Sequence, residues 1–112
     1  MMTSPYSEHH ILDRLAAIIK ERASETEQKS YTATLLAHAP QLPARKLTEE
    51  ATEVLIEALS GDKDKLAAES ADLLYHLLVV WQAAGLSPQT VWQKLSERMG
   101  VSGHDEKASR GE

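Results

Sequence analysis

Two stretches of this sequence repeat one acidic pattern on either side of a glycine. Leu47 to Leu59 and Leu66 to Leu78 both read Leu-x-x-Glu-x-x-acid, followed by two aliphatic residues. Acids three residues apart lie on one face of a helix. A short turn at Gly61 and Asp62 separates the two stretches. The pattern therefore predicts two antiparallel helices that form a hairpin, each with an acidic face.

The acids are placed symmetrically about Gly61. Glu53 lies eight residues before this glycine and Glu69 eight after it, while Glu50 and Asp72 lie eleven before and eleven after. At a rise of about 1.5 Å per residue, a hairpin folded at Gly61 places all four acids about two turns from the bend. Helical periodicity leaves two alternatives open. Both acid pairs face the seam between the helices, or both face away from it.

Four clustered carboxylates repel one another and raise one another's pKa unless a cation neutralises them. We expect Mg²⁺, with Mn²⁺ possible, because both prefer carboxylate and water oxygens and Mg²⁺ commonly also binds substrate phosphates. Zinc thiolate sites are excluded because the chain has no cysteine. A ferritin-type di-iron site is disfavoured because Glu-x-x-His does not occur. The alternative interpretation is an ordinary solvated acidic face, in which Lys46 and Glu50 form an i,i+4 pair.

The rest of the chain has helical periodicity and no strand pattern. Apolar spacing predicts helices at about 8–23, 31–39, 44–60, 63–84 and 88–99. Ser30, Asp62 and Ser87 are the expected N-caps. Pro40 and Pro43 are expected to break the chain before the third helix. We therefore predict an all-α helical bundle built around the hairpin, with 1–100 as a single domain and 101–112 as a polar tail.

Charge and hydropathy narrow the possible partners. The chain has 12 basic and 17 acidic residues, a formal net charge of -5. Non-specific nucleic-acid binding and polybasic membrane binding need a basic surface, so we expect neither. The longest apolar stretch, Leu73 to Ala84, is shorter than the roughly 20 residues that span a bilayer. The N-terminus has no basic-then-apolar signal region, so we expect a soluble cytoplasmic protein.

Basic residues near the acids are candidates for holding a phosphorylated substrate. Arg45 and Lys46 lie one turn before the first acids, and are either solvated or bind phosphate oxygens. Lys107 and Arg110 lie in the polar tail, which is either a disordered terminus or a flap that closes over an anionic ligand. His76, on the acidic face of its helix, is more simply a core histidine than a metal ligand.

At these residues the sequence resembles the phosphoribosyl-ATP pyrophosphohydrolase family, the second enzyme of histidine biosynthesis. The similar segments are Lys46 to Glu53, Glu69 to Leu78, Ser102-Gly103 and Glu106 to Arg110, with Ser30-Tyr31-Thr32 and Leu35-Leu36 upstream. The acid pattern alone marks only the wider all-α NTP pyrophosphohydrolase superfamily. The Asp-Leu-Leu-Tyr-His-Leu-Leu and Glu-Lys-Ala-Ser-Arg runs are more specific. Two departures are Thr48, where the family usually has Gly, and the segment 39–45, where it is usually Lys-rich.

The resemblance implies a homodimer that hydrolyses 1-(5-phosphoribosyl)-ATP to 1-(5-phosphoribosyl)-AMP and pyrophosphate. It implies Mg²⁺ ligands at Glu50, Glu53, Glu69 and Asp72, with phosphate contacts at Lys46, Lys107 and Arg110. Either Glu50 or Glu53 would take the proton of the attacking water. Glu49 is a further candidate as ligand, base or supporting residue, although a helical wheel turns it away from Glu50 and Glu53. The alternatives are a housecleaning nucleoside-triphosphate pyrophosphohydrolase and a non-enzymatic helical interaction module.

Overall fold

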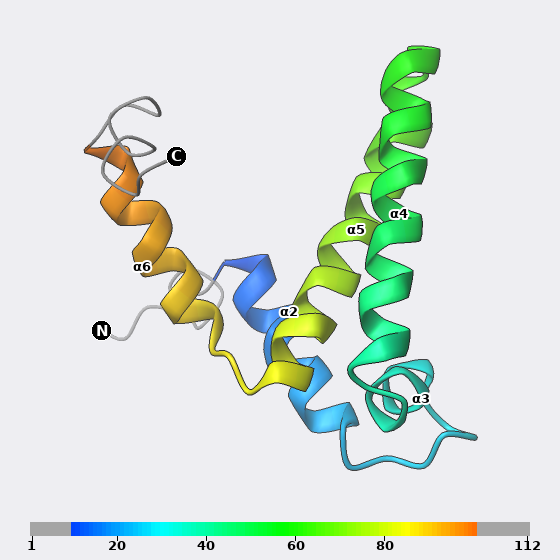
Figure 1. Ribbon diagram of the computed structural model, residues 1–112, viewed down its shortest axis with the longest axis vertical. Coiled ribbons are helices and arrows are strands. Elements are labelled where there is room, and N and C mark those ends of the chain that lie inside the picture. The colour runs from blue at the N-terminus through cyan, green and yellow to red at the C-terminus, as the bar shows by residue number, and fades with distance from the viewer. Residues whose placement is uncertain (1–9, 101–112) are drawn as a thin grey trace, which may run out of the picture.

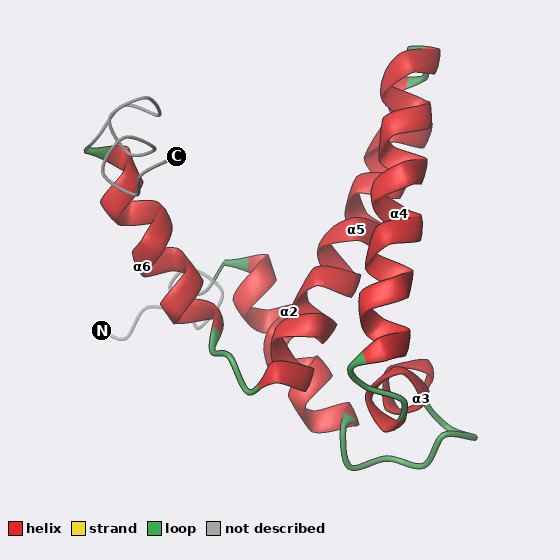
Figure 2. Cartoon of the chain, viewed as in Figure 1, coloured by secondary structure: helices red, strands yellow, loops and turns green. Residues whose placement is uncertain are grey.

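The computed structural model describes residues 10–100, and these residues form five helices (Figure 1). The helices are α2 (Ile11–Arg22), α3 (Tyr31–Ala37), α4 (Gln41–Ser60), α5 (Lys63–Ala84) and α6 (Pro88–Met99). No strand occurs in this part of the chain (Figure 2). The predicted all-α fold is confirmed, and each expected helix has a counterpart.

Three of the helices begin at the side-chain caps expected from the sequence. In each case a side-chain oxygen accepts a hydrogen bond from a backbone N–H two or three residues further along, which satisfies a donor left free at a helix start. These caps are Ser30 to Ala33 at 3.1 Å, Asp62 to Lys65 at 3.0 Å, and Ser87 to Gln89 at 3.2 Å. The three predicted N-caps are therefore confirmed.

α4 starts three residues earlier than the prolines led us to expect. It begins at Gln41, so Pro43 lies inside its first turn and is buried there. A proline lacks the N–H that a helix interior needs, but the first turn of a helix has no carbonyl partner for that N–H. Pro40 precedes the helix as its N-cap residue. The expected break at Pro43 was therefore wrong.

α4 and α5 form the long hairpin that dominates the structure (Figure 1). Gly61 ends α4 in the left-handed conformation, with a φ of 81°. Glycine reaches this region without the steric cost that a Cβ brings. Asp62 then caps α5, so the chain reverses within two residues and the two helices run antiparallel, side by side.

The buried core lies at the end of the hairpin away from Gly61. It consists of Ile19 from α2, Leu35 from α3, and Leu78 and Val79 from α5, with partly buried neighbours packed around it. Here α2 and α3 cover the second half of α5, whereas the half of the hairpin near Gly61 extends beyond them (Figure 1). The core thus fixes the base of the hairpin and leaves the acid-bearing part open to solvent.

α6 leaves the body of the structure in a different direction from the hairpin (Figure 1). Its first two turns are held by Asp13 of α2, which accepts hydrogen bonds from Trp92 Nε1 at 2.8 Å and Gln89 Nε2 at 3.3 Å. The rings of Trp92 and Trp81 also meet edge to face, 5.7 Å apart. None of the five described helices is both long enough and apolar enough to cross a bilayer.

Candidate metal centre

Carboxylates from both helices of the hairpin meet at one point. Glu50 comes from α4, and Glu69 and Asp72 come from α5. One carboxylate oxygen from each residue lies within 4.8 Å of the other two. Of the two alternatives left open by periodicity, the structure has the one in which acids face across the seam. Symmetry about Gly61 predicted four acids at this level of the hairpin, and three of them meet here.

Glu53 lies beside this group but is not a member of it. Its side chain is exposed, and its carboxylate falls outside the 4.8 Å set. Its negative charge nevertheless acts on Glu69, whose pKa it helps to raise. Glu53 therefore contributes negative charge to the site without being part of the three-carboxylate group.

The pKa of Glu69 is raised above the ordinary glutamate value. Partial burial of the carboxylate is the largest cause, followed by the negative charges of Asp72, Glu50 and Glu53 and by a hydrogen bond with Glu50. Like charges disfavour the ionised form, and a bound cation at the same place removes that cost. The all-oxygen donor set suits a hard divalent cation better than it suits zinc. These residues therefore fit Mg²⁺ or Mn²⁺.

Glu49 is held by the two basic residues that precede it. Lys46 Nζ lies 3.3 Å from one of its carboxylate oxygens, and Arg45 Nε lies 3.8 Å from the other. Glu49 is not part of the three-carboxylate group, in agreement with its place on the helical wheel. The sequence suggested that Lys46 would pair with Glu50, but Lys46 pairs with Glu49 and leaves the carboxylate of Glu50 in the group.

His76 is buried one turn beyond Asp72, with 6% of its surface exposed. Its Nδ1 lies 2.8 Å from the backbone carbonyl of Asp72, and because a carbonyl only accepts, Nδ1 carries the proton. Its Nε2 has no hydrogen-bond partner among the described residues. Tyr75 and Tyr31 lie edge to face with its ring, at 4.9 and 6.2 Å. His76 is thus a core residue and not a member of the carboxylate group.

The two basic residues of the tail, Lys107 and Arg110, lie outside the described residues. So does the whole segment 101–112 that the sequence suggested as a flap. Their contact with substrate therefore stays a prediction, as does the metal-binding role of the four acids.

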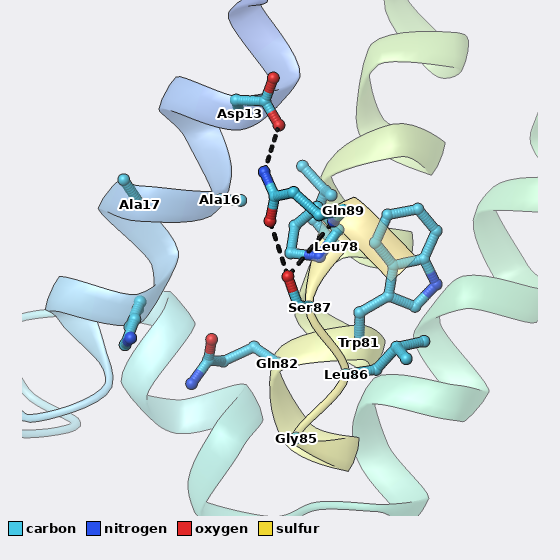
Figure 3. A pocket seen from close by; sticks show the side chains of 12 residues that line it. Asp13, Ala16, Ala17, Leu78, Trp81, Gln82, Gly85, Leu86, Ser87 and Gln89 are labelled. Atoms are coloured by element: carbon cyan, nitrogen blue, oxygen red, sulfur yellow. Dashed lines mark hydrogen bonds between the residues drawn. The ribbon is translucent and has the colours of Figure 1, made fainter. Parts of the chain in front are cut away.

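A pocket of about 430 Å³ lies elsewhere, between α2, the end of α5 and the start of α6 (Figure 3). Asp13, Gln89 and Ser87 form a hydrogen-bonded row along it, beside Leu78 and Trp81. None of the predicted site residues lines this pocket. The sequence did not predict this pocket, because Asp13 and Gln89, which meet along it, are 76 residues apart in the chain and share no local pattern.

The fold and the site together define a class: all-α proteins in which a helical hairpin presents clustered carboxylates suited to a divalent cation. Residues 12–99 match the phosphoribosyl-ATP pyrophosphohydrolase family. The chain belongs to this family, and it is an enzyme of the hydrolase class. The resemblance seen in the motifs is thereby confirmed over most of the chain.

Individual relatives agree with this assignment. A phosphoribosyl-ATP pyrophosphatase of Azospirillum brasilense is 50% identical over 100 residues, which cover 89% of this chain and 90% of the relative. The proteins of the same name from Paramagnetospirillum magneticum and Granulibacter bethesdensis are each 49% identical over 100 residues. Those residues cover 92% of the first of these two relatives and 62% of the second.

Proposed function

We propose that this protein hydrolyses 1-(5-phosphoribosyl)-ATP to 1-(5-phosphoribosyl)-AMP and pyrophosphate, the second step of histidine biosynthesis, in the cytoplasm. The observation that carries the proposal is the meeting of Glu50, Glu69 and Asp72 across the hairpin seam. It occurs in a chain whose relatives are named for this activity. A triphosphate needs its negative charge balanced before water attacks it, and this site suits the cation that does so.

Mg²⁺, or Mn²⁺ in its place, would be held by Glu50, Glu69 and Asp72, with Glu53 as a further ligand or base. The bound ion would neutralise charge on the triphosphate oxygens and on the pyrophosphate that leaves. The donor set supports this assignment, because all its atoms are carboxylate oxygens, and the pKa of Glu69 is raised by desolvation first and then by the charges of the neighbouring acids.

Glu53 is the general base in this proposal, and Glu50 is the alternative. The carboxylate of Glu53 lies outside the three-acid group, so its oxygens are available for a water molecule. The water oxygen attacks the α-phosphorus, and its proton goes to Glu53. The bond from the α-phosphorus to the bridging oxygen then breaks, and pyrophosphate leaves with that oxygen. The α-phosphorus stays with the nucleotide product, and the other two phosphorus atoms leave as pyrophosphate. No covalent enzyme intermediate forms.

The basic residues would hold the phosphates. Lys46 and Arg45 both contact Glu49, which is about half exposed, so both stand at the surface one turn from the carboxylate group. Phosphate oxygens would replace Glu49 as their partner when substrate binds. Glu49 then has a supporting role, holding the two cations in place. Lys107 and Arg110 would close over the substrate from the tail.

The active form is a homodimer in this proposal. Large aliphatic side chains are exposed at the end of the hairpin and on α6, among them Leu59 at 81% and Met99 at 86%. Monomeric proteins rarely leave grouped apolar side chains of this size in water. A second copy that covers them would complete the bundle.

The direct test is pyrophosphate release from phosphoribosyl-ATP, with Mg²⁺ and with the metal removed by EDTA. We expect turnover only with the metal, and much slower turnover of dCTP or dUTP. Glu53→Gln should reduce turnover at least about 100-fold, the usual contribution of a general base. Glu21→Gln, an exposed glutamate on α2, is the matched control and should retain full activity. Metal-independent turnover, or a preference for dCTP, would contradict the proposal.

A further inference from the structure

One face of α4, near the hairpin turn, carries a cluster of exposed aliphatic side chains that we call the tip patch. It consists of Leu55, Ile56 and Leu59, which are 57%, 49% and 81% exposed. At about 100° per residue, these three lie on the side of α4 opposite the half-buried Val54. No element of the described chain covers the tip patch, because α2 and α3 pack at the other end of the hairpin.

α6 carries the second exposed apolar surface, which we call the α6 stripe. Trp92, Leu95 and Met99 recur at helical spacing, so they lie along one side of the helix. The stripe begins in a contact within the chain, since Trp92 meets Trp81 and Asp13. One and two turns further on, Leu95 and Met99 are 49% and 86% exposed. Only the Trp92 end of the α6 stripe is therefore packed within the described chain, and the Leu95 and Met99 side chains are left exposed.

Charges beside the two surfaces are opposite in sign. On a helical wheel, Lys94 and Arg98 border one edge of the α6 stripe, and Glu53 borders one edge of the tip patch. Opposite charges along the edges of two apolar surfaces orient them relative to each other and disfavour other partners. The tip patch and the α6 stripe thus match in both hydropathy and charge.

We propose that, in the homodimer proposed above, the α6 stripe of each copy packs on the tip patch of the other copy. Within one chain the hairpin and α6 diverge from a common base (Figure 1), so the two surfaces are carried on separate arms. A two-fold dimer repeats each contact. The tip patch and the α6 stripe of each chain are therefore both covered by the other chain. The exchange also brings Lys94 and Arg98 of the second copy beside Glu53, next to the carboxylate group.

Charge complementation between two variants tests the exchange without relying on activity. The first variant is Leu55→Lys/Leu59→Lys in the tip patch, and the second is Leu95→Glu/Met99→Glu in the α6 stripe. In a dimer made of one variant alone, the new charges face charges of the same sign in both interfaces. Each variant alone should therefore dissociate at least about 100-fold more readily than wild type. In a mixed dimer, one interface is wild type and the other pairs Lys with Glu. Mixing should therefore restore dimers, measured by sedimentation velocity.

Gln93→Glu adds charge to the opposite face of α6 and is the matched control, expected to leave the dimer unchanged. Circular dichroism of each variant shows that its helices are retained. Two variants that stay monomeric after mixing would overturn the exchange. A monomeric wild-type chain would overturn it as well. Turnover of phosphoribosyl-ATP by the wild type is measured separately, so the proposed reaction stands or fails independently of this result.

Discussion

Glu69 is the acid of the carboxylate group whose pKa is raised above the ordinary glutamate value. Its carboxylate is partly buried and faces the charges of Asp72, Glu50 and Glu53, and both effects raise its pKa. A glutamate whose pKa is higher in the folded state than in the unfolded chain binds its proton more tightly when folded. The metal-free protein therefore loses stability as pH rises from about 4.5, the ordinary glutamate value, through the raised pKa of Glu69.

Glu69→Gln should remove this cost and the metal site together. Without divalent cations at neutral pH, we expect the variant to melt at a higher temperature than wild type, with a smaller difference near pH 5. Mg²⁺ at one hundred times its dissociation constant stabilises a single-site protein by about 2.7 kcal/mol, and the variant should lose most of this gain. Thermal melts with EDTA and with Mg²⁺ measure both effects. A variant that still gains the full metal stabilisation would exclude Glu69 as a ligand.

Tyr75 gives a second pH dependence, at the alkaline end. Burial raises the pKa of its phenol above 10.0, and the hydrogen bond with Thr32, at 2.5 Å, offsets part of that rise. In the unfolded chain the phenol ionises near 10, so the folded state loses stability as pH rises above that value. Tyr75→Phe should flatten this alkaline loss, as measured by urea unfolding between pH 8 and about 11. An unchanged pH profile would contradict the assignment.

At the scale of elements, the hairpin depends on the reversal at Gly61. Its φ of 81° lies in the left-handed region, and a Cβ added there meets no atom within 4 Å. The cost of a side chain is therefore one of backbone conformation and not of space. Gly61→Ala should lower the free energy of unfolding by about 1 kcal/mol, and Gly61→Asn by less, because asparagine tolerates this region. Equal stability of all three proteins in urea would show that the turn relaxes at no cost.

The elements that the sequence predicted well are those governed by local rules. Helix spacing and the caps at Ser30, Asp62 and Ser87 act within a few residues of one another, and the symmetry of the acids needs only the short turn at Gly61. The departure of Glu53 from the carboxylate group was not predictable, because it depends on side-chain directions within the packed hairpin. The bond between Trp92 and Asp13 joins residues 79 apart, and neither one carries a local signal for the other.

At the scale of the molecule, the small core at the hairpin base holds three helices together. Leu35 of α3 is fully buried there against α2 and α5. Leu35→Ala should cost about 2–5 kcal/mol, through lost burial and the cavity left behind. Because the carboxylates lie outside this core, we expect the folded fraction of the variant to keep its metal affinity. Urea unfolding measures the first effect and Mn²⁺ titration the second. A Leu35→Ala protein as stable as wild type would place the core elsewhere.

The central claim is that carboxylates from α4 and α5 jointly hold one divalent-cation site, and calorimetric titration with Mg²⁺ or Mn²⁺ tests it most directly. The wild-type chain should bind the metal saturably, and Glu50→Gln on one helix and Asp72→Asn on the other should each weaken binding at least about tenfold. Glu21→Gln should titrate like wild type. Binding that survives unchanged in both Glu50→Gln and Asp72→Asn would contradict the account, because the metal would then have no need of the seam between the two helices.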